Sequence, residues 1–199
     1  WIMVKIGVLI SGGGTNLQAV IDGCENKSIN GEVRVVISNK ENAYGLERAR
    51  LSKIKAVYET DEDKIIELLK ENNIDLIVLA GYLKIITPKF VDEFRNKIIN
   101  IHPSLIPSFC GKGYYGEKVH QGVIDYGAKV TGATVHFVDE GADTGAIIMQ
   151  EAVNVEQDDD AKSLAKRVLE VEHRILKESI RLFCENKLSI QGRRVFINE

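Results

Sequence analysis

The sequence predicts an α/β fold in which helices cover both faces of a mostly parallel central sheet. Short apolar runs alternate with helical patterns through the first half of the chain, which is typical of strand–helix–strand units. The apolar runs are nearly continuous, as in LIVLA at residues 76–80, and parallel strands buried on both faces have this composition. We expect one compact domain over residues 3–199 of the 199-residue chain, and a cloning remnant at residues 1 and 2.

Apolar periodicity and chain breakers place the elements of the first half. Three glycines at residues 12–14 end the first strand, and an apolar stripe of Ile65, Ile66, Leu68 and Leu69 indicates a helix. Pro88 suits the first turn of a helix. The expected strands are 5–11, 33–38, 55–58, 76–80 and 97–101, and the expected helices are 16–24, 43–52, 61–72 and 88–94.

The second half has a different pattern. The glycine-rich stretch GKGYYG at residues 111–116 indicates a mobile loop. Three aspartates at residues 158–160 favour the start of a long helix, because negative charge is stabilised at a helix N-terminus. The expected helices are 117–126 and 161–185, the expected strands are 130–138 and 146–155, and the last fourteen residues have no clear assignment.

Composition excludes several classes of protein. Lys and Arg number 26 against 29 Asp and Glu, a net charge of −3, so the chain lacks the basic excess of a nucleic-acid-binding protein. Its apolar runs are too short to span a membrane, and no export signal opens the chain. Cys24, Cys110 and Cys184 show neither a CxxC pattern nor metal-ligand spacing. We therefore expect a cytoplasmic protein without a bound metal.

The first candidate site is the glycine loop SGGGTN at residues 11–16, between a strand and a helix. Backbone N–H groups at such a turn bind anions, and glycine permits close approach. The alternative is an ordinary tight turn with Asn16 as the helix cap. A dinucleotide fingerprint is excluded because Leu17 stands where its third glycine belongs, and no Gly-Lys-Ser/Thr sequence of a Walker A loop follows.

The second candidate is NIHPSLIP at residues 100–107. Asn100 and His102 are two residues apart, so on a strand both point to the same face, and Pro103 ends the strand. They then lie at the carboxyl edge of the sheet, where α/β proteins bind ligands. An amide N–H beside a protonatable imidazole can stabilise a developing oxyanion. The alternative is a structural histidine beside a turn-forming asparagine.

The third candidate is the loop DEGADTG at residues 139–145. Asp143 is a plausible partner for His102, because a carboxylate beside an imidazole stabilises its protonated form and fixes its tautomer. Asp139 and Glu140 resemble a solvated rim, and an ordinary acidic turn remains the alternative.

Three other groups carry weaker signals. Glu172 and His173 adjoin within the long C-terminal helix, and charged pairs in helices are mostly solvated. His136 is interpreted as a structural or supporting residue, and His120 as a helix-surface residue. Tyr114 and its neighbour Tyr115 either form a lid or simply pack.

Together these segments resemble a known family. SGGGTNLQ, GYLKIITP, NIHPSLIP and TVHFVDEGADTGAII occur in this order, and Glu172-His173 follows. The chain is similar to the folate-dependent formyltransferases, most closely to the branch that acts on glycinamide ribonucleotide. The resemblance covers residues 3 to about 185 and implies a Rossmann-like formyltransferase fold.

The resemblance also implies a reaction and its residues. A formyl group passes from the co-substrate 10-formyltetrahydrofolate to the amine of the ribonucleotide, by direct attack through a tetrahedral oxyanion and without a metal. The implied catalytic residues are Asn100, His102 and Asp143. The implied ribonucleotide-binding residues are Gly14, Thr15, Asn16 and Glu172. The implied folate-binding residues are Leu83, Lys84, Ile85, Ile86, Asn100, Asp139, Glu140, Gly141, Ala142 and Asp143.

The implied partners are small molecules, with no nucleic acid and no membrane, and the chain is expected to be a monomer or homodimer. Three rival functions differ in one feature each. A methionyl-tRNA formyltransferase carries a further C-terminal RNA-binding domain, and a formyltetrahydrofolate hydrolase carries a further N-terminal regulatory domain; we expect neither extension here. A non-catalytic phosphate-binding module would explain the glycine loop but not Asn100, His102 and Asp143.

Overall fold

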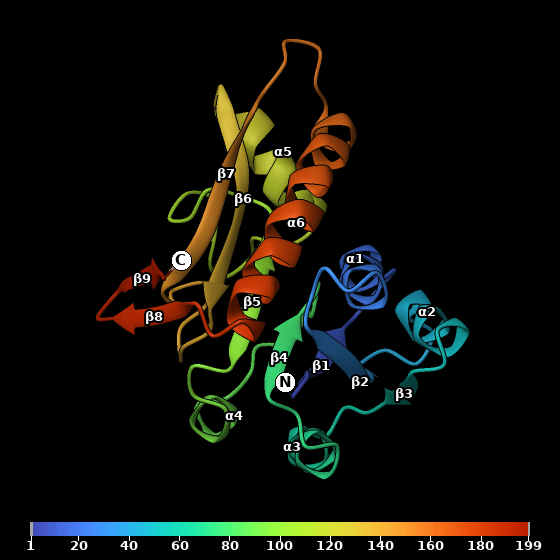
Figure 1. Cartoon of the computed structure of the whole chain (residues 1–199). Helices are drawn as coiled ribbons and strands as arrows, with labels where there is room; N and C mark the ends of the chain where they lie inside the picture. Colours follow the sequence, from blue (N-terminus) through green and yellow to red (C-terminus); the bar gives the residue numbers. More distant parts are fainter. Residues whose placement is uncertain (1, 199) are drawn as a thin grey trace.

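The computed structural model describes residues 2–198, which form a nine-stranded sheet with helices on both faces (Figure 1). The strand order is β3-β2-β1-β4-β5-β6-β7-β9-β8. The first five strands of this order, from β3 at the edge to β5, are parallel to one another. Strand β6 is antiparallel to both β5 and β7, and β9 pairs parallel to β7. The strands are β1 (Val4–Ile10), β2 (Gly31–Ser38), β3 (Lys55–Tyr58), β4 (Leu76–Leu79), β5 (Ile98–His102), β6 (Val130–Phe137), β7 (Ile147–Asn154), β8 (Leu188–Gln191) and β9 (Arg194–Ile197).

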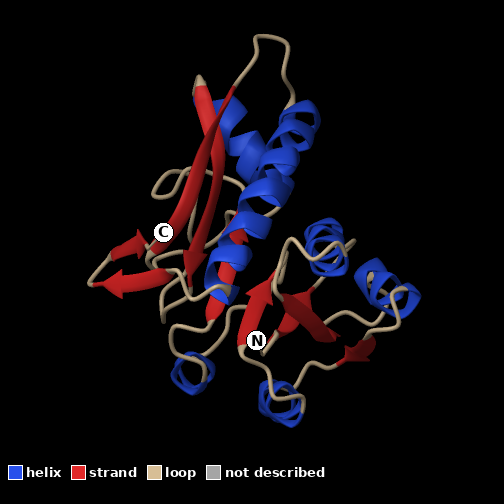
Figure 2. Ribbon diagram, in the orientation of Figure 1, coloured by secondary structure: helices blue, strands red, loops and turns tan. Residues whose placement is uncertain are grey.

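Two apolar clusters, one on each face of the sheet, hold the helices in place. Side chains of α1, α2, α5 and α6 join the larger cluster, and those of α3 and α4 join the smaller one. Figure 2 shows the long helix α6 lying across the sheet on the side opposite α3 and α4. The helices are α1 (Thr15–Glu25), α2 (Tyr44–Leu51), α3 (Glu62–Glu71), α4 (Pro88–Glu93), α5 (Glu117–Tyr126) and α6 (Ala161–Cys184). This arrangement confirms the predicted α/β fold.

Local sequence explains where several helices begin. Asp160 accepts a hydrogen bond from the N–H of Ser163, whose hydroxyl accepts one from the N–H of Asp160, so the two residues form a capping box for α6. Asp61 caps α3 with its carboxylate, and Thr87 caps α4 directly before Pro88. Each cap satisfies N–H groups that have no partner within the helix.

The parallel strands bring three candidate segments to one edge of the sheet. The glycine loop follows β1, residues 83–86 follow β4, and Asn100 and His102 lie at the end of β5. Strands β1, β4 and β5 are neighbours, so their carboxyl ends open onto the same edge.

The C-terminus differs from the expectation of no clear structure. Residues 188–191 and 194–197 pair as the antiparallel hairpin β8–β9, joined through Gly192 with φ of 62°. These strands lie outside the strand–helix alternation of the first half, which is the pattern that predicted the equally short β3. No helix among the described residues is long and apolar enough to cross a lipid bilayer.

Candidate active site

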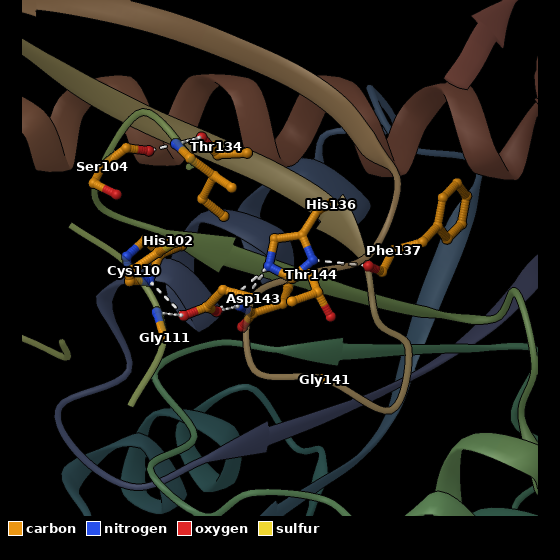
Figure 3. A network of polar contacts seen from close by, with 12 residues as sticks. His102, Ser104, Cys110, Gly111, Thr134, His136, Phe137, Gly141, Asp143 and Thr144 are labelled. Atoms are coloured by element: carbon orange, nitrogen blue, oxygen red, sulfur yellow. Dashed lines mark hydrogen bonds and ion pairs between the residues drawn. The ribbon is translucent and has the colours of Figure 1, made fainter. Parts of the chain in front are cut away.

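The structure brings Asn100, His102 and Asp143 together, although Asp143 lies 43 residues beyond Asn100. Asp143 Oδ2 lies 3.7 Å from His102 Nδ1 (Figure 3). Asp143 Oδ1 lies 3.5 Å from Asn100 Nδ2. His102 is buried, and Asp143 is mostly buried. The predicted convergence of an amide, an imidazole and a carboxylate is therefore present.

His136 joins this group as a fourth member. Its Nδ1 is 2.7 Å from the backbone carbonyl of Phe137, and a carbonyl can only accept, so Nδ1 carries the proton. In the neutral ring, Nε2 is then the acceptor for the Asn100 side-chain N–H, 3.1 Å away. His136 thus fixes which way the Asn100 amide points, and the second amide hydrogen of Asn100 faces Asp143 Oδ1, 3.5 Å away.

The charge state of Asp143 follows from its surroundings. Burial raises the pKa of Asp143, but the neighbouring rings of His136 and His102 and the N–H of Gly111 together lower it below its ordinary value. The carboxylate is therefore ionised at neutral pH. The backbone of Asp143 has φ of 57°, a left-handed conformation that aspartate adopts more readily than most residues.

The loop after β5 holds both members of the His102–Asp143 pair through its backbone. The carbonyl of Phe109 is 2.9 Å from His102 Nε2, and the N–H of Gly111 donates to Asp143 Oδ2 at 3.0 Å. Both ring nitrogens of His102 therefore face acceptors, an arrangement that a protonated imidazole satisfies.

A cavity of about 300 Å³ opens beside these side chains. Most of the residues implied as folate-binding line it, with one exception: Glu140 instead pairs with Arg95 beyond the end of α4. Tyr114 and Tyr115, from the loop interpreted as a possible lid, also line the cavity. The implied residues on its wall are Leu83, Lys84, Ile85, Ile86, Asn100, Asp139, Gly141, Ala142 and Asp143.

The glycine loop forms a second part of the site, at the start of α1. Gly14, with φ of 76°, is the residue before the helix, and Thr15 begins it. Asn16 is therefore not the helix cap; its amide donates to Glu172 Oε1 of α6 at 3.2 Å. Glu172 is buried, so the expectation of a solvated charged pair with His173 is wrong for Glu172. Burial raises the pKa of Glu172 to about 7.

One buried hydroxyl links the glycine loop to the cavity wall. Ser11 Oγ accepts a hydrogen bond from the N–H of Leu83 at 2.9 Å and donates to Asn39 Oδ1 at 2.5 Å. The structure therefore ties the ends of β1, β2 and β4 together at the site.

His120 was expected on the helix surface, and this is wrong. It is 4% exposed and packs on the inner face of α5. Burial, together with the charge of His102, lowers the pKa of His120 to about 4. His120 adjoins Val119 and lies three residues before Val123, the other buried residues of α5, so helical spacing places it on the buried face.

The family model described as formyl transferase matches residues 4–180. The chain belongs to the formyl transferase family. It is 42% identical to a phosphoribosylglycinamide formyltransferase of Haemophilus influenzae, over 98% of this chain and 94% of that protein. It is 41% identical to the chloroplastic phosphoribosylglycinamide formyltransferase of Arabidopsis thaliana, over 92% of this chain but only 66% of that protein's length.

A solved structure agrees with this membership. The crystal structure of glycinamide ribonucleotide transformylase 1 from Symbiobacterium toebii has a TM-score of 0.93 and 45% identity. The match covers 99% of this formyl transferase chain and 95% of that one.

Sequence reasoning undervalued one residue of this formyl transferase site and missed another. His136 pairs directly with Asn100 in the register of β5 and β6, so strand alternation would have placed both side chains on one face had the pairing been known. The Phe109 carbonyl carries no signal in the sequence, because every residue supplies the same backbone carbonyl and only the fold decides where it points.

Proposed function

We propose that this chain transfers a formyl group from 10-formyltetrahydrofolate to the amine of glycinamide ribonucleotide, a step of purine biosynthesis. The observation that carries the proposal is the grouping of Asn100, His102 and Asp143 at a cavity of about 300 Å³. The 42% identity to a phosphoribosylglycinamide formyltransferase over nearly both full chains supports the choice of substrates.

The reaction starts with attack of the neutral amine on the formyl carbon. A carbon–nitrogen bond forms, and the formyl oxygen becomes an oxyanion. The Asn100 N–H that faces Asp143 at 3.5 Å donates to that oxygen, as does the Nδ1–H of the protonated His102, which is too far from Asp143 (3.7 Å) for a hydrogen bond. Both donors are held in place before the charge develops, and they stabilise it. Asp143 stabilises the positive charge of His102, since it is ionised and 3.7 Å from Nδ1.

Collapse of the intermediate breaks the bond between the formyl carbon and N10 of the folate. Asp143, through a water molecule, accepts a proton from the attacking nitrogen, and His102 supplies one to the departing N10. The products are the formylated amide and tetrahydrofolate. The proton that Asp143 has accepted then passes to His102, which returns both residues to their starting protonation states.

The two substrates occupy different parts of the site. The ribonucleotide phosphate meets the backbone of Gly14, Thr15 and Asn16 at the start of α1, where N–H groups and the helix dipole favour an anion. Glu172, directly behind Asn16, contacts the glycinamide part. The folate lies in the cavity lined by residues 83–86, Asp139 and residues 141–143.

Turnover tests this proposal directly. The protein is mixed with the 10-formyl donor and glycinamide ribonucleotide, and the folate absorbance is followed together with the mass of the formylated product. We expect product only when both substrates are present. Folate release without the amine would indicate a hydrolase, and absence of product with both substrates would overturn the proposal.

A further inference from the structure

Helix α2 contacts the glycine loop through the backbone carbonyls of that loop. The N–H of Gly45 donates to the carbonyl of Gly12 at 3.0 Å. Arg48 Nε donates to the carbonyl of Gly13 at 2.7 Å. Two successive carbonyls are thus turned toward α2, which lies beside α1 in Figure 1.

This orientation decides where the N–H groups of the loop point. In a trans peptide the carbonyl of one residue and the N–H of the next point in opposite directions. With the carbonyls of Gly12 and Gly13 turned toward α2, the N–H groups of Gly13 and Gly14 are directed away from it. Consecutive N–H groups that point outward form the concave nest that binds anions.

The close approach of helix and loop depends on two facing glycines. A Cβ on Gly14 would lie 2.8 Å from the Cα of Gly45, and Gly14 also has φ of 76°. A Cβ on Gly45 would lie 2.2 Å from Ile10 Cδ1. Larger residues at either position would separate α2 from the loop.

Arg48 is itself held in position. Its Nη1 lies 3.4 Å from Gln18 Oε1 on α1, and its guanidinium stacks 5.0 Å from the ring centre of Tyr44. Arg50, two residues along the same helix, is exposed and contacts only the exposed Glu47, at 3.5 Å. The two arginines therefore carry equal charge but differ in contact with the loop.

We propose that Arg48 is a positioning residue that holds the glycine loop in its anion-binding conformation. This inference rests on the proposed function for the identity of the anion, the ribonucleotide phosphate. Arg48 acts through the Gly13 carbonyl, and the loop N–H groups make the contact with phosphate.

The experiment compares Arg48→Met, Arg48→Lys and the matched control Arg50→Met by steady-state kinetics. Arg48→Met keeps the apolar stem over Tyr44 and removes the donor. We expect the KM for the ribonucleotide to rise roughly 10-fold, the usual effect of losing a charge-assisted hydrogen bond. The kcat and the KM for the folate donor stay near wild type, since phosphate binding is uniform through the reaction.

Arg48→Lys keeps a cationic donor for the Gly13 carbonyl, so we expect most of the affinity to return. Arg50→Met loses the same charge and should leave the KM unchanged. An unchanged KM in Arg48→Met would overturn the inference. An equal rise of the KM in Arg50→Met would overturn it too, because the loss of one positive charge would then explain the effect without the contact to the loop.

Hydrogen exchange on the ligand-free protein separates this inference from the proposed function. The amides of Gly45 and Gln18 donate to the carbonyls of Gly12 and Gly14, so both report on the rigidity of the loop. We expect faster exchange in Arg48→Met than in wild type or Arg50→Met. Unaltered exchange would contradict the positioning role even if the wild-type enzyme turns over, and a wild-type protein without turnover would fail the proposed function alone.

Discussion

Substitution of the buried Glu172 by glutamine should stabilise the protein at alkaline pH and have little effect at acidic pH. The change keeps the shape and the acceptor for the Asn16 amide but removes the ionisable group. Glu172 is 7% exposed, and its one hydrogen-bond donor compensates only part of its desolvation.

The magnitude follows from the pKa. Burial raises the pKa of Glu172 from 4.5 to about 7, and each unit corresponds to about 1.36 kcal/mol. Below pH 4.5 the carboxyl is protonated in both the folded and unfolded states. Between pH 4.5 and about pH 7, Glu172 is ionised in the unfolded state only, so the free energy of unfolding falls as pH rises. Above pH 7 the full difference, about 3 kcal/mol, is lost in the wild type but not in the variant.

Urea and thermal unfolding of both proteins at pH 5 and pH 8 measure this effect. The other carboxyl groups are common to both proteins and cancel in the comparison. We expect the variant to gain about 3 kcal/mol at pH 8, or roughly 6–12 °C in Tm for a chain of this size, and much less at pH 5. Glu170→Gln on the exposed face of the same helix is the control. A stability gain that is the same at both pH values would refute the reasoning.

The catalytic group offers further predictions. His102→Ala or Asn100→Ala should each lower kcat by roughly 10²-fold or more in the turnover assay, as expected for loss of an oxyanion donor; near-wild-type turnover in either would remove the mechanism. Asp143→Asn should lower kcat by about 10²-fold at every pH from 6 to 9, because the asparagine cannot support a charged His102; recovery at any of these pH values would contradict this role. Asp159→Asn should lower the free energy of unfolding by about 2 kcal/mol at pH 7, since Asp159 accepts hydrogen bonds from both Nη atoms of Arg167 at 2.6 and 2.7 Å. Those bonds lower the pKa of Asp159, so the deficit measured by urea unfolding should shrink as pH falls below about 4, and a constant deficit would point to packing instead.

Much of the fold could be predicted because its strands and helices have strong apolar periodicity. The predicted helix at 117–126 matches α5 (Glu117–Tyr126), and the strand at 55–58 matches β3 (Lys55–Tyr58). The observed helix boundaries differ from the predicted ones where backbone conformation decides them. Gly14, with its positive φ, is the last residue before α1, so the helix begins at Thr15. The hairpin of β8 and β9 was missed because it follows the long helix α6 outside the strand–helix alternation that predicted β3.

The candidate site was predictable in its side chains but not in its supports. Strand alternation places Asn100 and His102 on one face, and the resemblance to the formyltransferases implied Asp143 as their partner. The proton position on His136 depends on the carbonyl of Phe137, a contact that no pattern of residue types encodes. The burial of His120 likewise depends on how α5 packs on the sheet, which is tertiary information.

The backbone contacts from Phe109 and Gly111 connect one loop to both members of the His102–Asp143 pair. The connection is made by a main-chain carbonyl and a main-chain N–H, so side-chain replacements nearby leave it intact. Deleting Cys110, or inserting a residue beside it, would change the spacing of the two backbone contacts, so the loop could not make both as it does here. In this chain, segment length is therefore as strict a requirement for the chemistry as the identity of any reacting side chain.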